Sequence, residues 1–309
     1  MIAVAIVAAV AAAMSNSLAA YFQQSADKRL DTGDSVPLRK VPVLIREPRW
    51  LLGQAFDISA FVCQAVALAF GALVFVEPML VLSLPITVMV RSWSARRRLP
   101  GRVGVVGSTL AVLGISVFLG VGRPTSGGAT IDLGEALELA VAVAVVLGIV
   151  LGWGRTASGN ARAVAFALGA GTVYGVTAGL TKVVTGELQH GGVLAALGHW
   201  PLYAGIAAGV TGVWLTQNAL KPGALAAPVA AITLTDPLVA IAIGLVWLGE
   251  SVTASAWAVA VQILAVLAMV VGVVILAHQP EAASAPTGEE DDSGSGDAGE
   301  GSAHAGAAH

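Results

Sequence analysis

The sequence predicts an all-α polytopic membrane protein of about nine transmembrane helices. Of its 309 residues, 56% are hydrophobic and only 11% are charged, whereas a soluble domain contains about 25% charged residues. The mean hydropathy is +0.82, and one apolar run after another reaches the roughly 20 residues that a helix needs to cross a bilayer. Most of the chain is therefore expected to lie in a lipid bilayer.

The apolar runs divide into nine expected spans that together form one transmembrane domain over residues 1–277. The second and third spans meet at Gly71 with almost no loop, and the seventh and eighth meet at Lys221-Pro222-Gly223. The expected bounds are 2–23, 50–70, 72–91, 103–122, 134–153, 163–184, 200–219, 224–247 and 256–277.

The C-terminal segment, residues 278–309, has a different composition. It is rich in Gly, Ser and Ala, and residues 279–309 contain seven acidic residues and no Lys or Arg. Such a segment cannot bury enough apolar surface to fold, so we expect a disordered acidic tail. The remaining body is net positive, with 16 basic residues against 12 acidic ones (19 minus the seven of the tail).

Known enzyme and cofactor signatures are absent from the sequence. The single Cys63 cannot form an intrachain disulfide, and no Cys/His cluster has the spacing of a zinc site. No phosphate-binding loop, dinucleotide fingerprint or nucleophile elbow occurs. The basic residues lie in short loops between spans, which argues against nucleic-acid binding. We therefore expect no enzymatic activity and no cofactor.

Lys and Arg predict the orientation in the plasma membrane, because loops on the cytoplasmic side carry an excess of these residues. With the N-terminus outside, only Arg123 and Lys182 remain outside, and the acidic tail lies in the cytoplasm. The alternative, a cleaved signal peptide, requires a basic start, but residues 1–13 carry no charged side chain. The fourteen basic residues then placed inside are Lys28, Arg29, Arg39, Lys40, Arg46, Arg49, Arg91, Arg96, Arg97, Arg98, Arg102, Arg155, Arg162 and Lys221.

An internal repeat relates the third and eighth spans. ALAFGALVFVEPMLVLSLP at 67–85 aligns with ALKPGALAAPVAAITLTDP at 219–237, an offset of 152 residues (219 minus 67) that pairs Pro85 with Pro237. Spans that are five apart run in opposite directions, so the repeat is inverted, with halves at about 2–153 and 163–277. Inverted repeats are typical of secondary transporters, which bind substrate near the midplane between the halves.

These features resemble the drug/metabolite transporter superfamily, over about residues 2–277. Trp247-Leu248-Gly249-Glu250, followed by an apolar span with Gly272, is similar to the EamA-type end of a repeat, and Arg96-Arg97-Arg98 resembles the same junction in the first half. The resemblance implies two inverted repeats in one bundle, with nine helices here in place of ten.

Within this superfamily, the nine spans and the outside N-terminus are closest to the NIPA-like magnesium transporter branch. Trp50-Leu51-Leu52-Gly53 at the start of the second span and the proline-containing third span carry this resemblance. NIPA-like proteins tend to end the first span with Gln-Lys-Lys, whereas this chain has Gln23-Gln24-Ser25. The resemblance implies magnesium as a candidate substrate.

Two spans place a carboxylate directly before a proline, at Glu77-Pro78 and Asp236-Pro237. Each proline frees the carbonyl four residues earlier, and an unpaired carbonyl in lipid needs protein, water or an ion as a partner. The carbonyls expected to be freed are those of Val74 (by Pro78), Val81 (by Pro85), Ala224 (by Pro228) and Thr233 (by Pro237).

Such carbonyls beside a carboxylate offer the hard oxygen ligands that suit a cation, a proton or an amine. Asp236 and Glu77 are therefore the leading binding residues and the candidate metal ligands. Asp236 is expected near the midplane, with Thr233 on the same helical face. The alternatives are an aspartate bonded to Thr233, Thr235 or a neighbouring helix, and a Glu77 that reaches interfacial water.

Further candidates lie on other spans. Asp57 and Gln64 share one stripe of the second span with Gln54 and Phe61; the alternative for Asp57 is pairing with Arg49 or Arg102. Asn16 in the first span (on one face with Gln23), Tyr174 in the sixth and Gln217 in the seventh complete the expected site; for Gln217 the alternative is ordinary interhelical hydrogen bonding.

Two more features of the sixth span predict structure and not binding. Gly171, Gly175 and Gly179 form a small-residue ridge for close helix packing. Lys182 is expected to extend its ammonium to the membrane surface.

The leading functional prediction is a secondary transporter for a small polar or cationic solute, with a proton as candidate coupling ion. One alternative is a magnesium transporter of NIPA-like type. Another is a non-transporting membrane protein that acts as an assembly partner or as an accessory protein of a lipid flippase. The expected partners are the solute or cation, the lipid bilayer and, as a candidate, a second copy of the chain.

Overall fold

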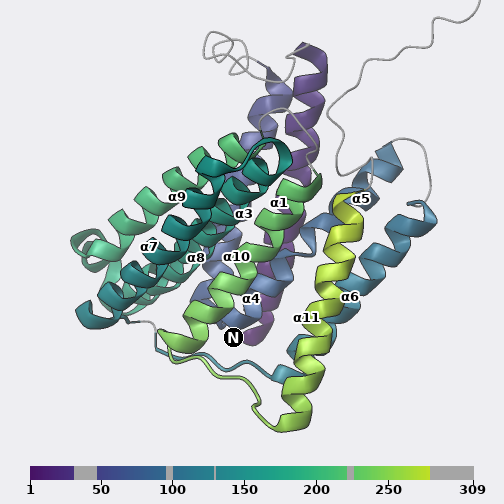
Figure 1. Cartoon of the computed structure of the whole chain (residues 1–309). Coiled ribbons are helices and arrows are strands. Elements are labelled where there is room, and N and C mark those ends of the chain that lie inside the picture. Colours follow the sequence, from purple (N-terminus) through teal and green to yellow (C-terminus); the bar gives the residue numbers. More distant parts are fainter. Residues whose placement is uncertain (31–46, 95–99, 129, 221–225, 279–309) are drawn as a thin grey trace, which may run out of the picture.

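The computed structural model describes residues 1–30, 47–94, 100–128, 130–220 and 226–278, with the side chains of Gln24 and of residues 26–30 excluded (Figure 1). The expected acidic tail, most of the basic loop residues and the Ala224 carbonyl lie outside the described residues. The helices are α1 (Ile2–Leu30), α3 (Pro48–Phe70), α4 (Leu73–Leu80), α5 (Ser83–Ser94), α6 (Arg102–Gly122), α7 (Leu133–Thr156), α8 (Gly159–Gly198), α9 (Trp200–Ala219), α10 (Ala226–Val246) and α11 (Ala256–Ala277).

These helices occupy all nine expected spans, and α4 with α5 together fill the third. In the described part of the chain, eight segments are long and apolar enough to cross a membrane. Helix α9 lies at the expected seventh span but is not among these eight. The chain thus has the build of a multi-pass helical membrane protein. Helix α8 extends well beyond its expected end and bends at Gly192, whose φ of 73° is a conformation that favours glycine.

The third expected span is broken between α4 and α5. Pro85 supplies no N–H to the Val81 carbonyl, and Leu84 N–H donates to that carbonyl instead, at 3.2 Å. Buried Ser17 of α1 also donates its hydroxyl to the Ser83 carbonyl, at 2.7 Å. The expectation of an unpaired Val81 carbonyl is therefore wrong, because the chain changes locally to a tighter turn that satisfies it.

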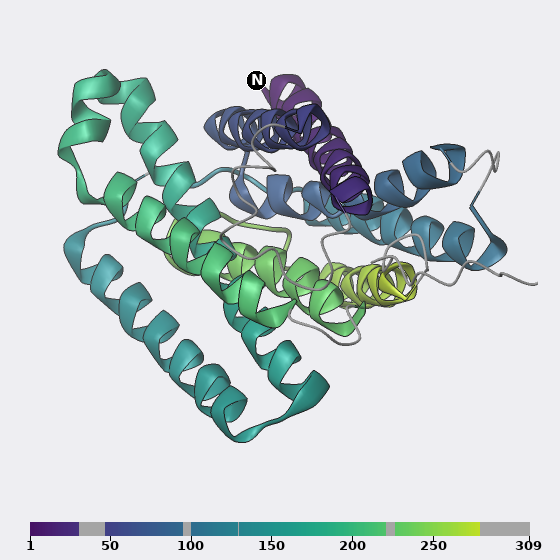
Figure 2. The ribbon, with the colours of Figure 1, turned by 90° about the horizontal axis from the view of Figure 1, so that it is seen from above.

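The helices pack in pairs around a central crossing (Figures 1 and 2). Helix α1 packs along α3, α6 along α11, and α8 along both α9 and α10, while α4 crosses α10 in the middle of the bundle. Close approach of α6 and α11 depends on glycine: a Cβ on Gly272 would lie 2.6 Å from the Ala111 nitrogen. Helix α7 packs on α8 at the edge of the bundle (Figure 2).

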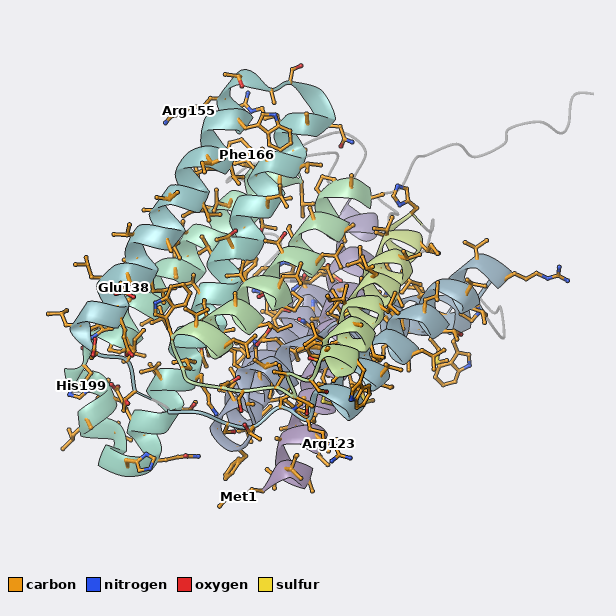
Figure 3. The ribbon with its side chains drawn as sticks, turned by 60° about the horizontal axis from the view of Figure 1, so that its bottom comes forward. Met1, Arg123, Glu138, Arg155, Phe166 and His199 are labelled. Atoms are coloured by element: carbon orange, nitrogen blue, oxygen red, sulfur yellow. The ribbon has the colours of Figure 1, made fainter. Side chains whose placement is uncertain are left out.

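The two ends of the bundle can be followed by their charged residues. Met1 and Arg123 lie at one end, and Arg155 lies at the opposite end (Figure 3). The segments around Arg123 and Ser251 meet in an isolated bridge between Thr125 and Ser251. We call this the Arg123 end; it also holds the α3–α4 hairpin (residues 68–74), which is connected to Glu250.

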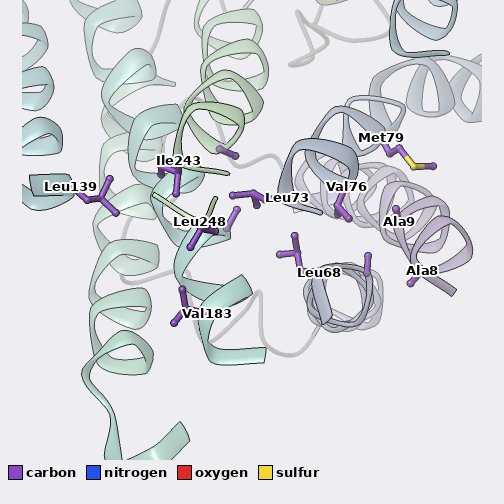
Figure 4. Close-up of a cluster of buried hydrophobic side chains, with 13 residues drawn as sticks. Ala8, Ala9, Leu68, Leu73, Val76, Met79, Leu139, Val183, Ile243 and Leu248 are labelled. Carbon is purple, nitrogen blue, oxygen red and sulfur yellow. The ribbon is translucent and has the colours of Figure 1, made fainter. Parts of the chain in front are cut away.

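The largest buried apolar cluster surrounds this hairpin (Figure 4). It joins residues of both halves of the chain, including Leu68 of α3, Leu73 of α4, Val183 of α8 and Ile243 of α10. Burial of this apolar surface holds the arms of the hairpin against the second half.

Candidate functional site

The α3–α4 hairpin brings Gln64 and Glu77 together. The chain reverses at Gly71, so the last turns of α3 face the first turns of α4, and Gln64 Nε2 donates to Glu77 Oε1 at 2.9 Å. Glu77 is only 1% exposed. The alternative in which Glu77 reaches interfacial water is therefore wrong, because α4 is covered by α1, α8 and α10.

Asp236 of α10 lies close enough to Glu77 for the charge of Glu77 to act on its carboxyl group. We call Glu77 and Asp236 the acid pair. The Oδ1 atom of Asp236 is buried and has no hydrogen-bond partner. Thr233 does not supply one, because its hydroxyl donates to the Val229 carbonyl at 2.9 Å. The alternative of an aspartate paired with Thr233 is thus wrong.

The glycine ridge of α8 explains how closely α10 packs against α8. A Cβ on Gly171 would lie 2.7 Å from Thr235 Cβ, and one on Gly175 would lie 2.8 Å from the Asp236 carbonyl oxygen. Both distances are shorter than side chains tolerate, so only glycine permits this approach. The prediction of close packing at the ridge is confirmed, and the ridge holds the Asp236 backbone.

Asp57 belongs to a separate polar group in the N-terminal half of α3. The Gln23 amide of α1 donates to Gln54 Oε1 at 2.9 Å and also to Asp57 Oδ2. The observed partner is therefore Gln23, and the suggested pairing of Asp57 with Arg49 or Arg102 is wrong. Gln23 lies here because Gly53 leaves room for it: a Cβ on Gly53 would be 2.7 Å from Gln23 Cγ.

Tyr174 lies within electrostatic range of both Asp57 and Asp236. Its hydroxyl shares a hydrogen bond of 3.1 Å with the Thr216 hydroxyl of α9, and its ring packs where Gly212 leaves space.

Two further predicted site residues, besides Asp57, are not brought to the acid pair. Asn16 of α1 and Gln217 of α9 are both exposed, and neither makes a hydrogen bond to the other predicted residues. Helical position alone could not decide which face would be covered by a neighbouring helix.

Sequence reasoning missed the roles of Lys182 and Glu250. Lys182 is 6% exposed, and its Nζ donates to the Leu68 and Gly71 carbonyls at 2.7 and 2.6 Å. The expectation that Lys182 reaches the membrane surface is wrong, because its ammonium finds carbonyl partners inside the bundle. A lysine within an otherwise apolar run was the available signal.

Glu250 is 4% exposed and accepts hydrogen bonds from the Leu73 and Val74 amides at 2.6 and 2.8 Å. Burial raises the pKa of Glu250. These two amides and the charge of Lys182 oppose that rise, because all three favour the ionised carboxylate.

Within the described residues, no group of three or more His, Cys, Asp or Glu side chains is arranged to hold a metal ion. Away from the acid pair, His199 Nδ1 lies 2.8 Å from Glu187 Oε1, a contact between an exposed histidine and a largely buried glutamate. Chemically, the acid pair offers one unpaired oxygen and a second carboxylate that has one amide donor. That arrangement can accept a proton or a cation.

Comparison with known proteins gives one relative. The chain is 29% identical over 244 residues to an uncharacterized protein of Corynebacterium glutamicum, and the match covers 78% of this chain and 84% of that protein. No protein-family model matches the chain, and no solved structure matches it.

Proposed function

We propose that this chain is a secondary transporter that moves a small polar or cationic solute across the plasma membrane by alternating access. The observation that carries the proposal is the buried, unpaired Oδ1 of Asp236 beside the charge of Glu77. An unpartnered carboxylate inside a membrane bundle is costly and is typical of a substrate or proton site.

The pairing of the helices supports the inverted repeat that such a mechanism uses. The first and second spans, α1 and α3, pack together, and so do the sixth and seventh, α8 and α9. The third span meets the eighth where α4 crosses α10, and the fourth meets the ninth where α6 packs on α11. In each case the corresponding spans are five apart in the chain. The acid pair lies on α4 and α10, the helices that cross between the two halves.

Magnesium is a second candidate solute, because the carboxylates of the acid pair lie within electrostatic range of each other. Magnesium keeps several waters and takes one or two carboxylates, so a pair suffices. The ammonium of Lys182 is also held away by the Leu68 and Gly71 carbonyls. A proton is the corresponding candidate for coupling.

The test uses the purified full chain in liposomes that contain a fluorescent magnesium indicator, followed by a panel of radiolabelled organic cations and polar metabolites under a proton gradient. Three variants are compared: Asp236→Asn, Glu77→Gln and, as the matched control, Glu138→Gln. Glu138 is also an acid on a span, but it is exposed on α7 (Figure 3), and α7 packs on α8 and not on α4 or α10.

We expect saturable uptake that Asp236→Asn abolishes and Glu138→Gln retains. Magnesium uptake with this pattern would identify magnesium as the solute. Uptake of an organic solute alone would assign the site to that solute. If no solute enters above empty liposomes, the transport proposal fails, and a non-transporting role in membrane assembly becomes the better explanation.

A further inference from the structure

The α3–α4 hairpin is held by charged side chains from the other half of the chain. Lys182 of α8 donates to two carbonyls at the end of α3, and Glu250 accepts from two amides at the start of α4, at distances of 2.6 to 2.8 Å. Gln189 of α8 adds a donor to the Ala69 carbonyl at 2.9 Å. The reversal of the chain is thus bound on both sides.

Each charge has the sign that its helix end attracts. The last carbonyls of a helix carry partial negative charge and the first amides carry partial positive charge. Lys182 lies at the C-terminal end of α3 and Glu250 at the N-terminal start of α4. The two opposite charges also act on each other.

The backbone groups that are bound here have no partner within their own helices. The final carbonyls and the first amides of any helix are left unpaired by the helical pattern. Release of the hairpin therefore breaks no hydrogen bond inside α3 or α4, and water can replace Lys182 and Glu250. Such a contact can open and close while both helices stay intact.

A strap consisting of residues 247–255 closes the same end. Thr125 and Ser251 exchange backbone hydrogen bonds of 2.9 and 3.3 Å, and Thr253 N–H donates to the Gly122 carbonyl at 2.7 Å. The strap carries Glu250 and so joins α4 to the segment that follows α6. In this conformation Glu77, on the second arm of the hairpin, is 1% exposed.

We propose that Lys182 and Glu250 form a latch that keeps the Arg123 end closed, and that this end opens when the latch releases the α3–α4 hairpin. Release moves Gln64 and Glu77, because the two arms of the hairpin carry them and a hydrogen bond joins them. The inference rests on the proposed transport function, for which it names the gate on one side.

A cysteine reporter tests the latch without any transported solute. Cys63 is replaced by alanine, and Ala72, which is 4% exposed at the tip of the hairpin, is replaced by cysteine. The full chain in lipid nanodiscs is reacted with a charged maleimide. Lys182→Met and Glu250→Gln are the latch variants, and Glu138→Gln, which changes an exposed acid on α7, is the control.

We expect the reporter to react about tenfold faster in each latch variant, which corresponds to about 1.4 kcal/mol lost from the closed state. Glu138→Gln should react at the parent rate. Equal rates in the parent and in folded latch variants would overturn the proposal, as would an equal acceleration in Glu138→Gln.

Hydrogen exchange gives a second measurement. It uses the unmodified protein, so it does not depend on whether a variant folds. A latch that opens makes the Leu73 and Val74 amides exchange through local opening, much faster than amides in the middle of α6 or α11. If these two amides exchange only as slowly as the mid-helix amides, the contact is a fixed brace and not a latch. If the hairpin opens but no solute is transported, the latch stands and the transport proposal fails. If a solute is transported but the hairpin does not open, the transport proposal stands and the latch fails.

Discussion

The acid pair and the latch both bury charged side chains between the two halves of the chain, but they satisfy them differently. In the latch, Lys182 and Glu250 each bind two backbone groups. In the acid pair, Glu77 has one amide donor, and Asp236 keeps a buried oxygen without a partner.

The difference separates a structural charge from a charge that awaits a ligand. A buried charge is tolerated when hydrogen bonds and an opposite charge replace its water. The latch meets this condition. The acid pair places two groups of like charge together, which disfavours the state in which both are ionised. A proton or a cation would relieve that cost.

The largest expected effect on stability comes from Lys182→Met. The variant leaves the Leu68 and Gly71 carbonyls without a donor and Glu250 without a nearby positive charge. Losing a charged partner from buried groups costs about 3 kcal/mol. Thermal unfolding in detergent should show a clearly lower midpoint, whereas Glu138→Gln, which changes an exposed acid on α7, should stay near the parent. An unchanged midpoint in Lys182→Met would mean that water already satisfies these carbonyls.

Gly175→Ala should have the next largest effect. Its new methyl group would lie 2.8 Å from the Asp236 carbonyl oxygen and 2.8 Å from Val239 Cβ, so α10 must move away from α8. Overpacking of this kind costs about 2 kcal/mol. Gly152→Ala on α7 is the matched control, because nothing lies within 4 Å of its added Cβ. Equal midpoints for the two variants would contradict the close contact at the ridge.

Asp236→Asn should affect stability in the opposite direction. Removing the charge relieves both its burial and its repulsion from Glu77, so we expect the free energy of unfolding to rise by about 1 kcal/mol. Chemical unfolding of the purified protein measures this, with Glu138→Gln as the exposed control. A strong loss of stability would show that Asp236 has a structural partner and would weaken its assignment to the site.

The smallest expected effect is a pH dependence caused by Glu250. Because burial raises the pKa of Glu250, the folded chain holds this proton more tightly than the unfolded chain. The resulting stability is fully present below the ordinary pKa of a glutamate and is lost as the pH rises through the raised value.

Across that pH range, the unfolding midpoint of the parent should fall as the pH rises. The midpoint of Glu250→Gln should not show this fall. In Lys182→Met the loss should occur at higher pH, since the charge of Lys182 no longer favours the ionised form. Identical pH profiles for the parent and Glu250→Gln would mean that the pKa of Glu250 is not shifted by folding.

Much of the fold follows from local sequence. Hydropathy and length predicted the segments in which the described helices lie, and the bounds agree closely at α6, expected at 103–122 and observed at Arg102–Gly122. The break between α4 and α5 was not predicted, because the sequence shows only that Pro85 lacks an N–H and not how the backbone compensates. The extension of α8 past residue 184 was likewise missed, since its polar end still forms helix.

The candidate site was predicted in part. The acid–proline pairs pointed to Glu77 and Asp236, and the structure places them within electrostatic range of each other. Gln64 was predicted from its helical stripe, but its contact with Glu77 depends on the reversal at Gly71. Asn16 and Gln217 shared the same polar character and nevertheless lie elsewhere.

The sequence by itself determined which segments are apolar enough to form membrane helices and which of them carry a charged residue. Only the tertiary structure decided which charges are satisfied. Lys182 meets carbonyls 114 and 111 positions away, and Glu250 meets amides 177 and 176 positions away. Helix formation depends on neighbours within a few residues, whereas pairing depends on how distant helices pack. Buried charges are therefore satisfied at the α3–α4 hairpin, while one carboxylate oxygen of Asp236 is left unpaired.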